Sequence, residues 1–232
     1  MTRGGPQAVL FDMDGLLIDS ERVWLEVESE VVAWLGGEWS TAHQEHLVGG
    51  SLDLAARYML ELTGADVAPE EVARRMLDGM AERLEACVPL MPGAKDLLAD
   101  VRAAGIPAAL VSSSHRRLLE PVLDAVGREH FAFSIAGDEV SRTKPDPEPY
   151  LTAAARLGAD PARCVVLEDS PNGVAAAEAA GCVTVAVPGV LPVHPAPGRT
   201  VVASLREVTV EWLRALPAFT GESSPADSAA DG

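Results

Sequence analysis

The stretch "VLFDMDGLLIDSE", residues 9–21, places two aspartates, Asp12 and Asp14, directly after a short apolar run. A third aspartate, Asp19, follows a second apolar run at 16–18. Carboxylates repel one another, and they are costly to place beside buried apolar segments unless another group compensates their charge. We therefore expect the rest of the chain to bring a metal site or a cationic side chain to these acids.

Further short apolar runs recur along the chain, and segments with helical spacing of apolar residues separate them. Continuous hydrophobicity, rather than alternation, indicates strands that are buried on both faces, as in a parallel sheet. Strands alternating with helices predict an α/β fold with a doubly wound, mostly parallel, Rossmann-like sheet. The expected strands lie at 8–11, 107–111, 133–137, 164–167, 183–187 and 200–202.

Residues 20–88 interrupt this alternation, because three apolar stripes with helical spacing follow one another without a strand-like run between them. This predicts an α-helical cap domain, 20–88, inserted into a discontinuous α/β core domain of residues 1–19 and 89–216. The tail at 217–232 is polar and rich in turn-forming residues, so we expect it to be disordered.

The composition is typical of a globular protein, with 48% hydrophobic and 23% charged residues and a net charge of −17. A chain this acidic repels nucleic acid and anionic membranes, so we expect neither as a partner. The sequence shows no signal-peptide pattern and no apolar run long enough to span a membrane. Three widely spaced cysteines suggest free thiols in a reducing compartment. We expect a cytoplasmic protein.

Polar side chains follow four of the expected strands, at the edge of the sheet where parallel strands end. Ligands of an open parallel sheet bind at this edge, which makes these side chains the candidates for chemistry. Lysine is scarce in the chain, so a lysine in this group is less easily explained as a surface residue. The candidates are Asp12, Asp14, Ser112, Ser113, Ser114, Lys144, Glu168 and Asp169.

This set of side chains suits phosphoryl transfer assisted by Mg²⁺. A hard cation takes oxygen ligands, which Asp12, Glu168 and Asp169 can supply. A carboxylate can attack phosphorus and form an aspartyl-phosphate, while Lys144 and a serine hydroxyl neutralise the phosphoryl oxygens. A second carboxylic acid, two residues after the first, can protonate the leaving oxygen and later deprotonate water.

Four motifs, in this order, resemble those of the haloacid dehalogenase-like hydrolase superfamily, in its branch with a small helical cap after the first strand. They are "DMDGLLIDS", "VSSS", "KPDPEPY" and "LEDSPNGVAAAEAAG", and the resemblance extends from residue 7 to about residue 215. The resemblance implies a Mg²⁺-dependent phosphatase that acts on a small phosphorylated metabolite, such as a sugar or polyol phosphate, through an aspartyl-phosphate.

The resemblance also implies a role for each matching residue. Asp12 corresponds to the nucleophile and a metal ligand. Asp14 corresponds to the general acid and base, and it also offers its backbone carbonyl to Mg²⁺. The remaining implied roles are phosphate binding by Ser112, Ser113 and Lys144, and metal binding by Glu168 and Asp169.

Four further residues are candidates for substrate selection, and each also has a purely structural interpretation. Trp24 is either a wall of the substrate pocket or part of the cap core. Gly49 and Gly50 form a turn that closes over the substrate or a plain loop between helices. His115 reaches the phosphate or only begins a solvated helix.

Two residues beside these candidates have structural roles to test. Ser114 is the better candidate for capping the helix that follows the serine loop. Asp138 either supports Lys144 or is an acid in a turn.

A phosphosugar isomerase of the β-phosphoglucomutase type is the alternative function. That family carries a histidine on the first cap helix and basic residues in a cap turn, where this chain has Trp24, Val48 and Leu52. A dehalogenase is disfavoured because those enzymes lack the second aspartate, which is present here as Asp14. The complete set of candidate residues argues against an inactive binding protein. The motifs do not single out one phosphate ester as the substrate. We expect a monomer, with a dimer as the alternative.

Overall fold

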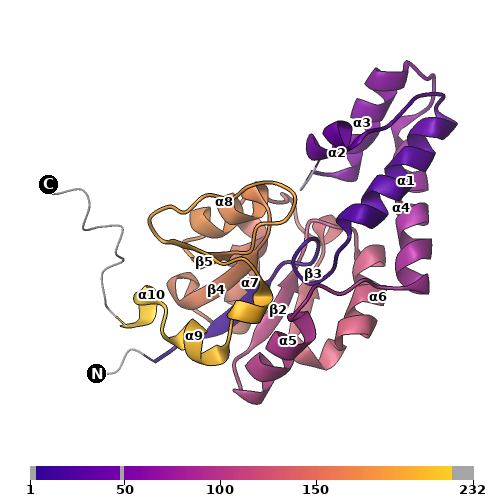
Figure 1. Ribbon diagram of the computed structural model, residues 1–232. Helices are drawn as coiled ribbons and strands as arrows, with labels where there is room; N and C mark the ends of the chain where they lie inside the picture. The colour runs from indigo at the N-terminus through magenta and orange to yellow at the C-terminus, as the bar shows by residue number, and fades with distance from the viewer. Residues whose placement is uncertain (1–3, 48–49, 221–232) are drawn as a thin grey trace, which may run out of the picture.

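A computed structural model describes residues 4–47 and 50–220 of the chain. Six parallel strands form one sheet in the order β3-β2-β1-β4-β5-β6 (Figure 1). This order and the parallel pairing confirm the predicted doubly wound, Rossmann-like α/β fold. The strands are β1 (Ala8–Phe11), β2 (Ala108–Val111), β3 (Phe133–Ile135), β4 (Cys164–Glu168), β5 (Val183–Ala186) and β6 (Arg199–Val201).

The first strand lies at the centre of the sheet and is buried on both faces. Val9 pairs with Ala108 of β2 on one side and with Val165 of β4 on the other. Val9 and its neighbours on the same face belong to the larger apolar core, whereas Leu10 belongs to a second cluster on the opposite face. The continuous apolar run around β1 therefore reflects burial between two layers of helices.

The helices of the core cover both faces of the sheet. Helices α5, α6 and α9 contribute to the larger apolar core, and helices α7 and α8 contribute to the cluster on the other face. The bounds are α5 (Ala94–Ala103), α6 (Arg116–Val126), α7 (Glu148–Leu157), α8 (Pro171–Ala179) and α9 (Val210–Arg214). Short 3₁₀ turns are η1 (Arg128–His130), η2 (Gly137–Glu139), η3 (Pro161–Arg163) and η4 (Leu205–Glu207).

Four helices between β1 and α5 form a second lobe of the molecule (Figure 1). Helix α4 packs against α1 and α3 within this lobe, and it also contacts α6 of the core. These helices occupy the predicted insertion at 20–88, while its independence as a domain stays a prediction. Their bounds are α1 (Glu21–Trp34), α2 (Thr41–Glu45), α3 (Leu52–Thr63) and α4 (Pro69–Ala86).

The two segments that join this lobe to the sheet lie side by side. The backbone N–H of Asp19 donates a hydrogen bond to the carbonyl oxygen of Pro89 at 2.8 Å. Ile18 forms an antiparallel bridge with Leu90. The chain therefore leaves and re-enters the core at one place.

Helix α2 is absent from the sequence-based expectations because no apolar stripe marks its five residues. A side-chain contact defines its start instead, where the backbone N–H of Ser40 donates to Nδ1 of His43 at 3.2 Å. Such a reciprocal capping contact involves single residues and leaves no periodic signal.

The expected disorder of the tail is wrong for its first four residues. Pro217–Thr220 form helix α10, and Phe219 is buried in the larger apolar core. Burial of the apolar ring of Phe219 attaches this segment to the core, although the composition of the tail as a whole is polar. The rest of the tail lies outside the described residues.

Within the part of the chain that the structure describes, no helix combines the length and apolar character needed to cross a bilayer.

Candidate active site

The turn after β1 places Asp12 and Asp14 at the carboxyl edge of the sheet. The backbone N–H of Asp12 donates to the carbonyl oxygen of Leu167 in β4 at 3.1 Å, which extends the strand pairing to this residue. Gly15 then adopts a φ of +74°, and a Cβ at this position would lie 2.0 Å from Oδ2 of Asp169. Glycine is therefore required here both for the turn and for the close approach of Asp169.

Lys144 is buried and contacts two of the candidate carboxylates. Its Nζ donates to Oδ1 of Asp12 at 2.5 Å, to Oε1 of Glu168 at 2.6 Å and to the carbonyl oxygen of Val111 at 2.9 Å. All three ammonium protons thus have acceptors inside the protein. The structure brings Lys144 to the nucleophile candidate, while its contact with phosphate stays a prediction.

One ammonium does not compensate all the carboxylates of this cluster. Burial, then the charge of Glu168, raises the pKa of Asp12 to about 8, although Lys144 opposes this shift. Burial and the charges of Asp12 and Glu168 hold the pKa of Asp169 well above its usual value. Burial alone would lower the pKa of Lys144, but the two carboxylates raise it, so Lys144 stays protonated. If all of these carboxylates were ionised, the site would carry excess negative charge.

Three of these carboxylates fit a divalent cation. Asp12, Glu168 and Asp169 each offer an oxygen, and these oxygens lie within 4.8 Å of one another. Oxygen ligands at this spacing suit Mg²⁺, and a cation would relieve the repulsion that raises the pKa values of Asp12 and Asp169. The side chain of Asp14 lies outside this group, so its metal contact stays a prediction for the backbone carbonyl alone.

Glu168 makes more hydrogen bonds than its sequence position suggests. The hydroxyl of Tyr150 donates to Oε1 of Glu168 at 2.5 Å, and the hydroxyl of Ser170 donates to Oε2 at 3.2 Å. Tyr150 is fully buried and was missed as a site residue. The sequence signal for Tyr150 is its place at the end of the motif "KPDPEPY", which begins with Lys144. A tyrosine buried near the site needs a partner for its hydroxyl, and a site carboxylate can be that partner.

The serine loop after β2 holds the carboxylate of Asp14. Ser114 Oγ donates to Oδ2 of Asp14 at 2.8 Å, and Ser112 Oγ donates to the same oxygen at 3.3 Å. Ser113 Oγ is buried and has no hydrogen-bond partner within the described ranges. The expected capping role of Ser114 is wrong, because His115 caps α6 by accepting from the backbone N–H of Arg117.

Replacing Ser114 by alanine is expected to lower kcat for phosphate release by about tenfold, because Asp14 loses its shorter charge-assisted hydrogen bond. Steady-state kinetics on any accepted ester measures the effect. Ser29→Ala is the matched control, since the hydroxyl of Ser29 donates to the carbonyl oxygen of Leu25 within α1, away from the cavity lining. Equal kcat values for the two variants would contradict the role of Ser114.

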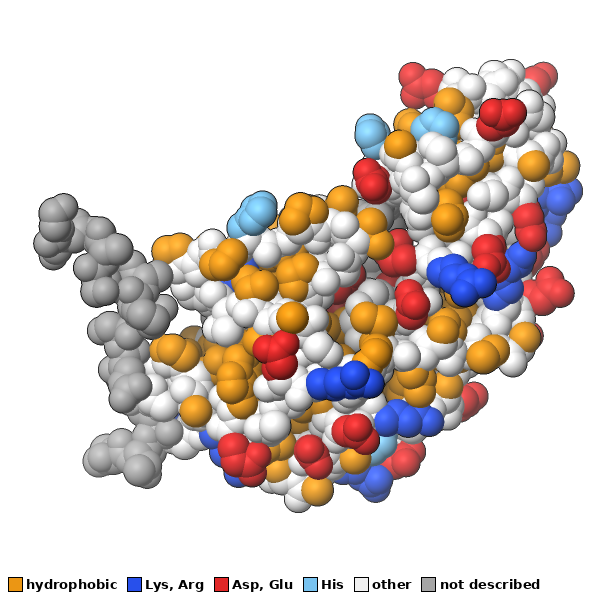
Figure 2. Space-filling view, viewed as in Figure 1, with side chains coloured by type: hydrophobic (Ala, Val, Ile, Leu, Met, Phe, Trp, Pro, Cys, Tyr) orange, Lys and Arg blue, Asp and Glu red, His pale blue; other side chains and the backbone are white. Residues whose placement is uncertain are grey.

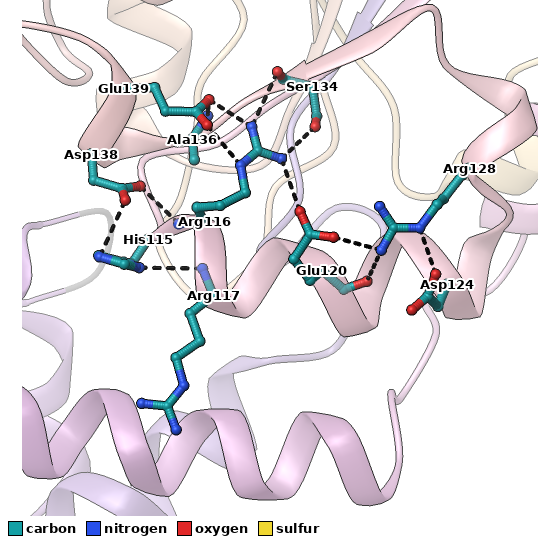
Figure 3. Close-up of polar contacts among 10 residues, drawn as sticks. All are labelled: His115, Arg116, Arg117, Glu120, Asp124, Arg128, Ser134, Ala136, Asp138 and Glu139. Carbon is teal, nitrogen blue, oxygen red and sulfur yellow. Dashed lines mark hydrogen bonds and ion pairs between the residues drawn. The ribbon is translucent and has the colours of Figure 1, made fainter.

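His115 lies at the rim of the site with both ring nitrogens engaged (Figure 3). Nδ1 accepts from Arg117, and Nε2 lies 3.2 Å from Oδ2 of Asp138. Asp138 also accepts from the backbone N–H of Arg116 at 2.7 Å, so it anchors the start of α6, while its support of Lys144 stays a prediction. Contact of His115 with a substrate stays a prediction.

A cavity of about 560 Å³ opens between the core and the helices of the insertion. Figure 2 shows acidic side chains gathered at the hollow between the two lobes. All eight candidates of the sheet edge except Glu168 line the cavity, as do Trp24, Gly50 and His115. Gly49 and Val48 lie outside the described residues. The cavity gives a small molecule access to the candidate catalytic residues.

This site sits on a fold that occurs among hydrolases of known sequence and structure. A family model described as haloacid dehalogenase-like hydrolase matches residues 6–181. The chain therefore belongs to the haloacid dehalogenase-like hydrolases.

Individual relatives agree with this membership. Hexitol phosphatase B of Escherichia coli (strain K12) is 35% identical over 187 residues, which cover 78% of this chain and 83% of that protein. A protein described as a probable pseudouridine-5'-phosphatase of Drosophila melanogaster is 35% identical over 221 residues, covering 91% of this chain and 94% of that protein. The crystal structure of CbbY from Rhodobacter sphaeroides with phosphate is similar at a TM-score of 0.78 and 29% identity, covering 87% of this chain and 96% of that one.

Proposed function

We propose that this hydrolase is a Mg²⁺-dependent phosphatase that acts on a small sugar or polyol phosphate through an aspartyl-phosphate on Asp12. The observation that carries this proposal is the cluster at the end of β1 and β4. There Asp12 touches Lys144 and lies within reach of Asp169, and two serines hold Asp14 nearby. The names of two relatives, a hexitol phosphatase and a probable pseudouridine-5'-phosphatase, support the same class of substrate.

In the first half-reaction, a carboxylate oxygen of Asp12 attacks phosphorus while the bond to the leaving oxygen breaks. Asp14 gives its proton to that oxygen, so the product leaves as an alcohol. Lys144 and the hydroxyls of Ser112 and Ser113 face the phosphoryl oxygens and offset their charge. Asp12, Glu168 and Asp169 would hold Mg²⁺, which would supply positive charge to offset that of the phosphoryl oxygens.

In the second half-reaction, Asp14 takes a proton from water, and the water oxygen attacks the phosphorus of the aspartyl-phosphate. The acyl phosphate bond breaks, which releases inorganic phosphate and restores the carboxylate of Asp12. The hydrogen bond from Ser114 keeps Asp14 in position for both transfers. In this proposal the core at 1–19 and 89–216 carries the chemistry, and the cap at 20–88 selects the substrate.

Phosphate release from a panel of sugar, polyol and nucleoside phosphates tests this function. We expect release with Mg²⁺ and a loss of at least about a hundredfold with EDTA, because a metal supplies several kcal/mol of charge stabilisation. Mg²⁺ at a hundred times its Kd should also raise the free energy of unfolding by about 2.7 kcal/mol.

The variant Asp169→Asn separates metal binding from other effects of the ion. It should lose most of the stabilisation by Mg²⁺, whereas Asp66→Asn, an acid on the surface of the cap, should keep it. No turnover of any ester in Mg²⁺ would contradict the proposed function. Interconversion of hexose 1- and 6-phosphates without phosphate release would establish the phosphosugar isomerase instead.

A further inference from the structure

The cap side of the cavity carries carboxylates and one amide side chain among apolar residues. Glu21 and Glu28 of α1 line it together with Gln44 of α2. Among the described residues that line the cavity, Lys144 is the only lysine or arginine, and it belongs to the core. Within the described lining, the permanently charged cation therefore lies at the end proposed to bind phosphate.

The two glutamates share one face of α1. Seven residues separate them, which corresponds to about two turns and about 10 Å along the helix axis. Gln44 fixes the position of Glu21, because its Nε2 donates to the carbonyl oxygen of Glu21 at 2.7 Å and to Oε2 of Glu21 at 3.3 Å. Trp39 fixes the position of Glu28, because its Nε1 donates to Oε2 of Glu28 at 3.1 Å. Both carboxylates are thus held in place along the cavity wall.

Neither glutamate has a cationic partner within the described residues. Glu28 is only 4% exposed. Burial, followed by the charges of Asp14 and Asp19, raises the pKa of Glu21 to about 7. Burial also raises the pKa of Glu28 to about 7, with the Trp39 hydrogen bond acting in the opposite direction. A second anion in this space would face uncompensated carboxylates in a poorly hydrated site.

Hydroxyl groups, by contrast, are donors that these carboxylates can accept. Trp24 adds an aromatic wall beside them. The wall thus offers several acceptors and an apolar surface to the part of the substrate that is not phosphate.

We propose that the cavity selects a phosphate monoester whose leaving group is uncharged and rich in hydroxyls, and that Glu21 and Glu28 exclude esters carrying a second anionic group. This inference rests on the proposed function and adds the charge of the leaving group to it. The two glutamates determine specificity and take no part in the phosphoryl transfer.

The test uses two esters that differ at one carbon, glucitol 6-phosphate and 6-phosphogluconate, which carry a hydroxymethyl and a carboxylate group there. At pH 8, where both glutamates are mainly ionised, kcat/KM of the wild type should favour glucitol 6-phosphate by at least about a hundredfold. Glu28→Gln and Glu21→Gln should each reduce this preference by about tenfold, because each removes one negative charge and keeps an acceptor.

Glu26→Gln is the matched control, because Glu26 lies on the same helix but pairs with Arg22 at the surface. Equal kcat/KM for the two esters would overturn the inference, and so would a change in Glu28→Gln no larger than in Glu26→Gln. Thermal unfolding of each variant shows whether it is folded.

Binding separates this inference from the proposed function. Calorimetry with the Asp12→Asn protein measures affinity for both esters without turnover. A preference in binding with no phosphate release by the wild type would leave the inference standing and contradict the phosphatase. Phosphate release with no preference between the esters would support the phosphatase and overturn the inference. Absence of both binding and release for both esters would also overturn the inference.

Discussion

Replacing Asp12 by asparagine is expected to lower kcat for phosphate release by at least about a thousandfold, because the amide cannot act as the nucleophile. The fold should survive, since an asparagine oxygen can still accept from the buried Nζ of Lys144 and one negative charge is removed from a crowded site. Rapid quenching and mass spectrometry should find the phosphoryl adduct on Asp12 in the wild type and not in the variant.

Asp19→Asn is the control for this variant. Asp19 belongs to the same segment but is exposed, and it does not line the cavity. Its kcat should stay within about twofold of the wild-type value. Full activity of Asp12→Asn would contradict the assignment of Asp12 as the nucleophile. A phosphoryl adduct on Asp14 would show that Asp14 is the nucleophile instead.

Replacing Lys144 by methionine is expected to lower the free energy of unfolding by about 3–5 kcal/mol at pH 8.5, because Asp12 and Glu168 would remain buried without their cation. Urea unfolding measures the effect in the absence of metal. Lys95→Met is the matched control, since Lys95 is an exposed residue of α5 and should change stability by less than about 0.5 kcal/mol.

The loss should depend on pH in a defined direction. The pKa of Asp12 is raised to about 8 in the folded protein, so the folded state binds more protons than the unfolded state between pH 4 and 8. Stability without metal therefore falls as the pH rises through this range. Without Lys144 the pKa of Asp12 rises further and the fall continues to higher pH, so the deficit of the variant should be smaller at pH 6. An equal deficit at both pH values would show that lost packing, not charge, causes it.

The sequence was sufficient to predict the strands of the sheet. The run around Val9 is apolar at every position because its neighbours bury both faces, and this leaves a local signal that needs no tertiary information. The spatial grouping of Asp12, Lys144 and Asp169 followed from one rule, that parallel strands end at the same edge.

The side-chain partners within the site could not be predicted in the same way. That Ser114 contacts Asp14, and that Tyr150 contacts Glu168, depends on the relative height of neighbouring loops, which no periodic pattern encodes. The position of Glu28 in the sequence does indicate an unusual residue. It lies between Val27 and Val31 on the buried face of α1, where a charged residue requires an explanation.

The pairing of Asp19 with Pro89 and of Ile18 with Leu90 brings the two ends of the insertion together. A segment whose ends meet can be exchanged for another of different length without stretching the sheet that carries it. If the proposed division of roles holds, substrate recognition and phosphoryl transfer are separable in this architecture. Grafting a foreign insertion between these two junctions would then change the substrate while the carboxylates at the ends of β1 and β4 keep their places.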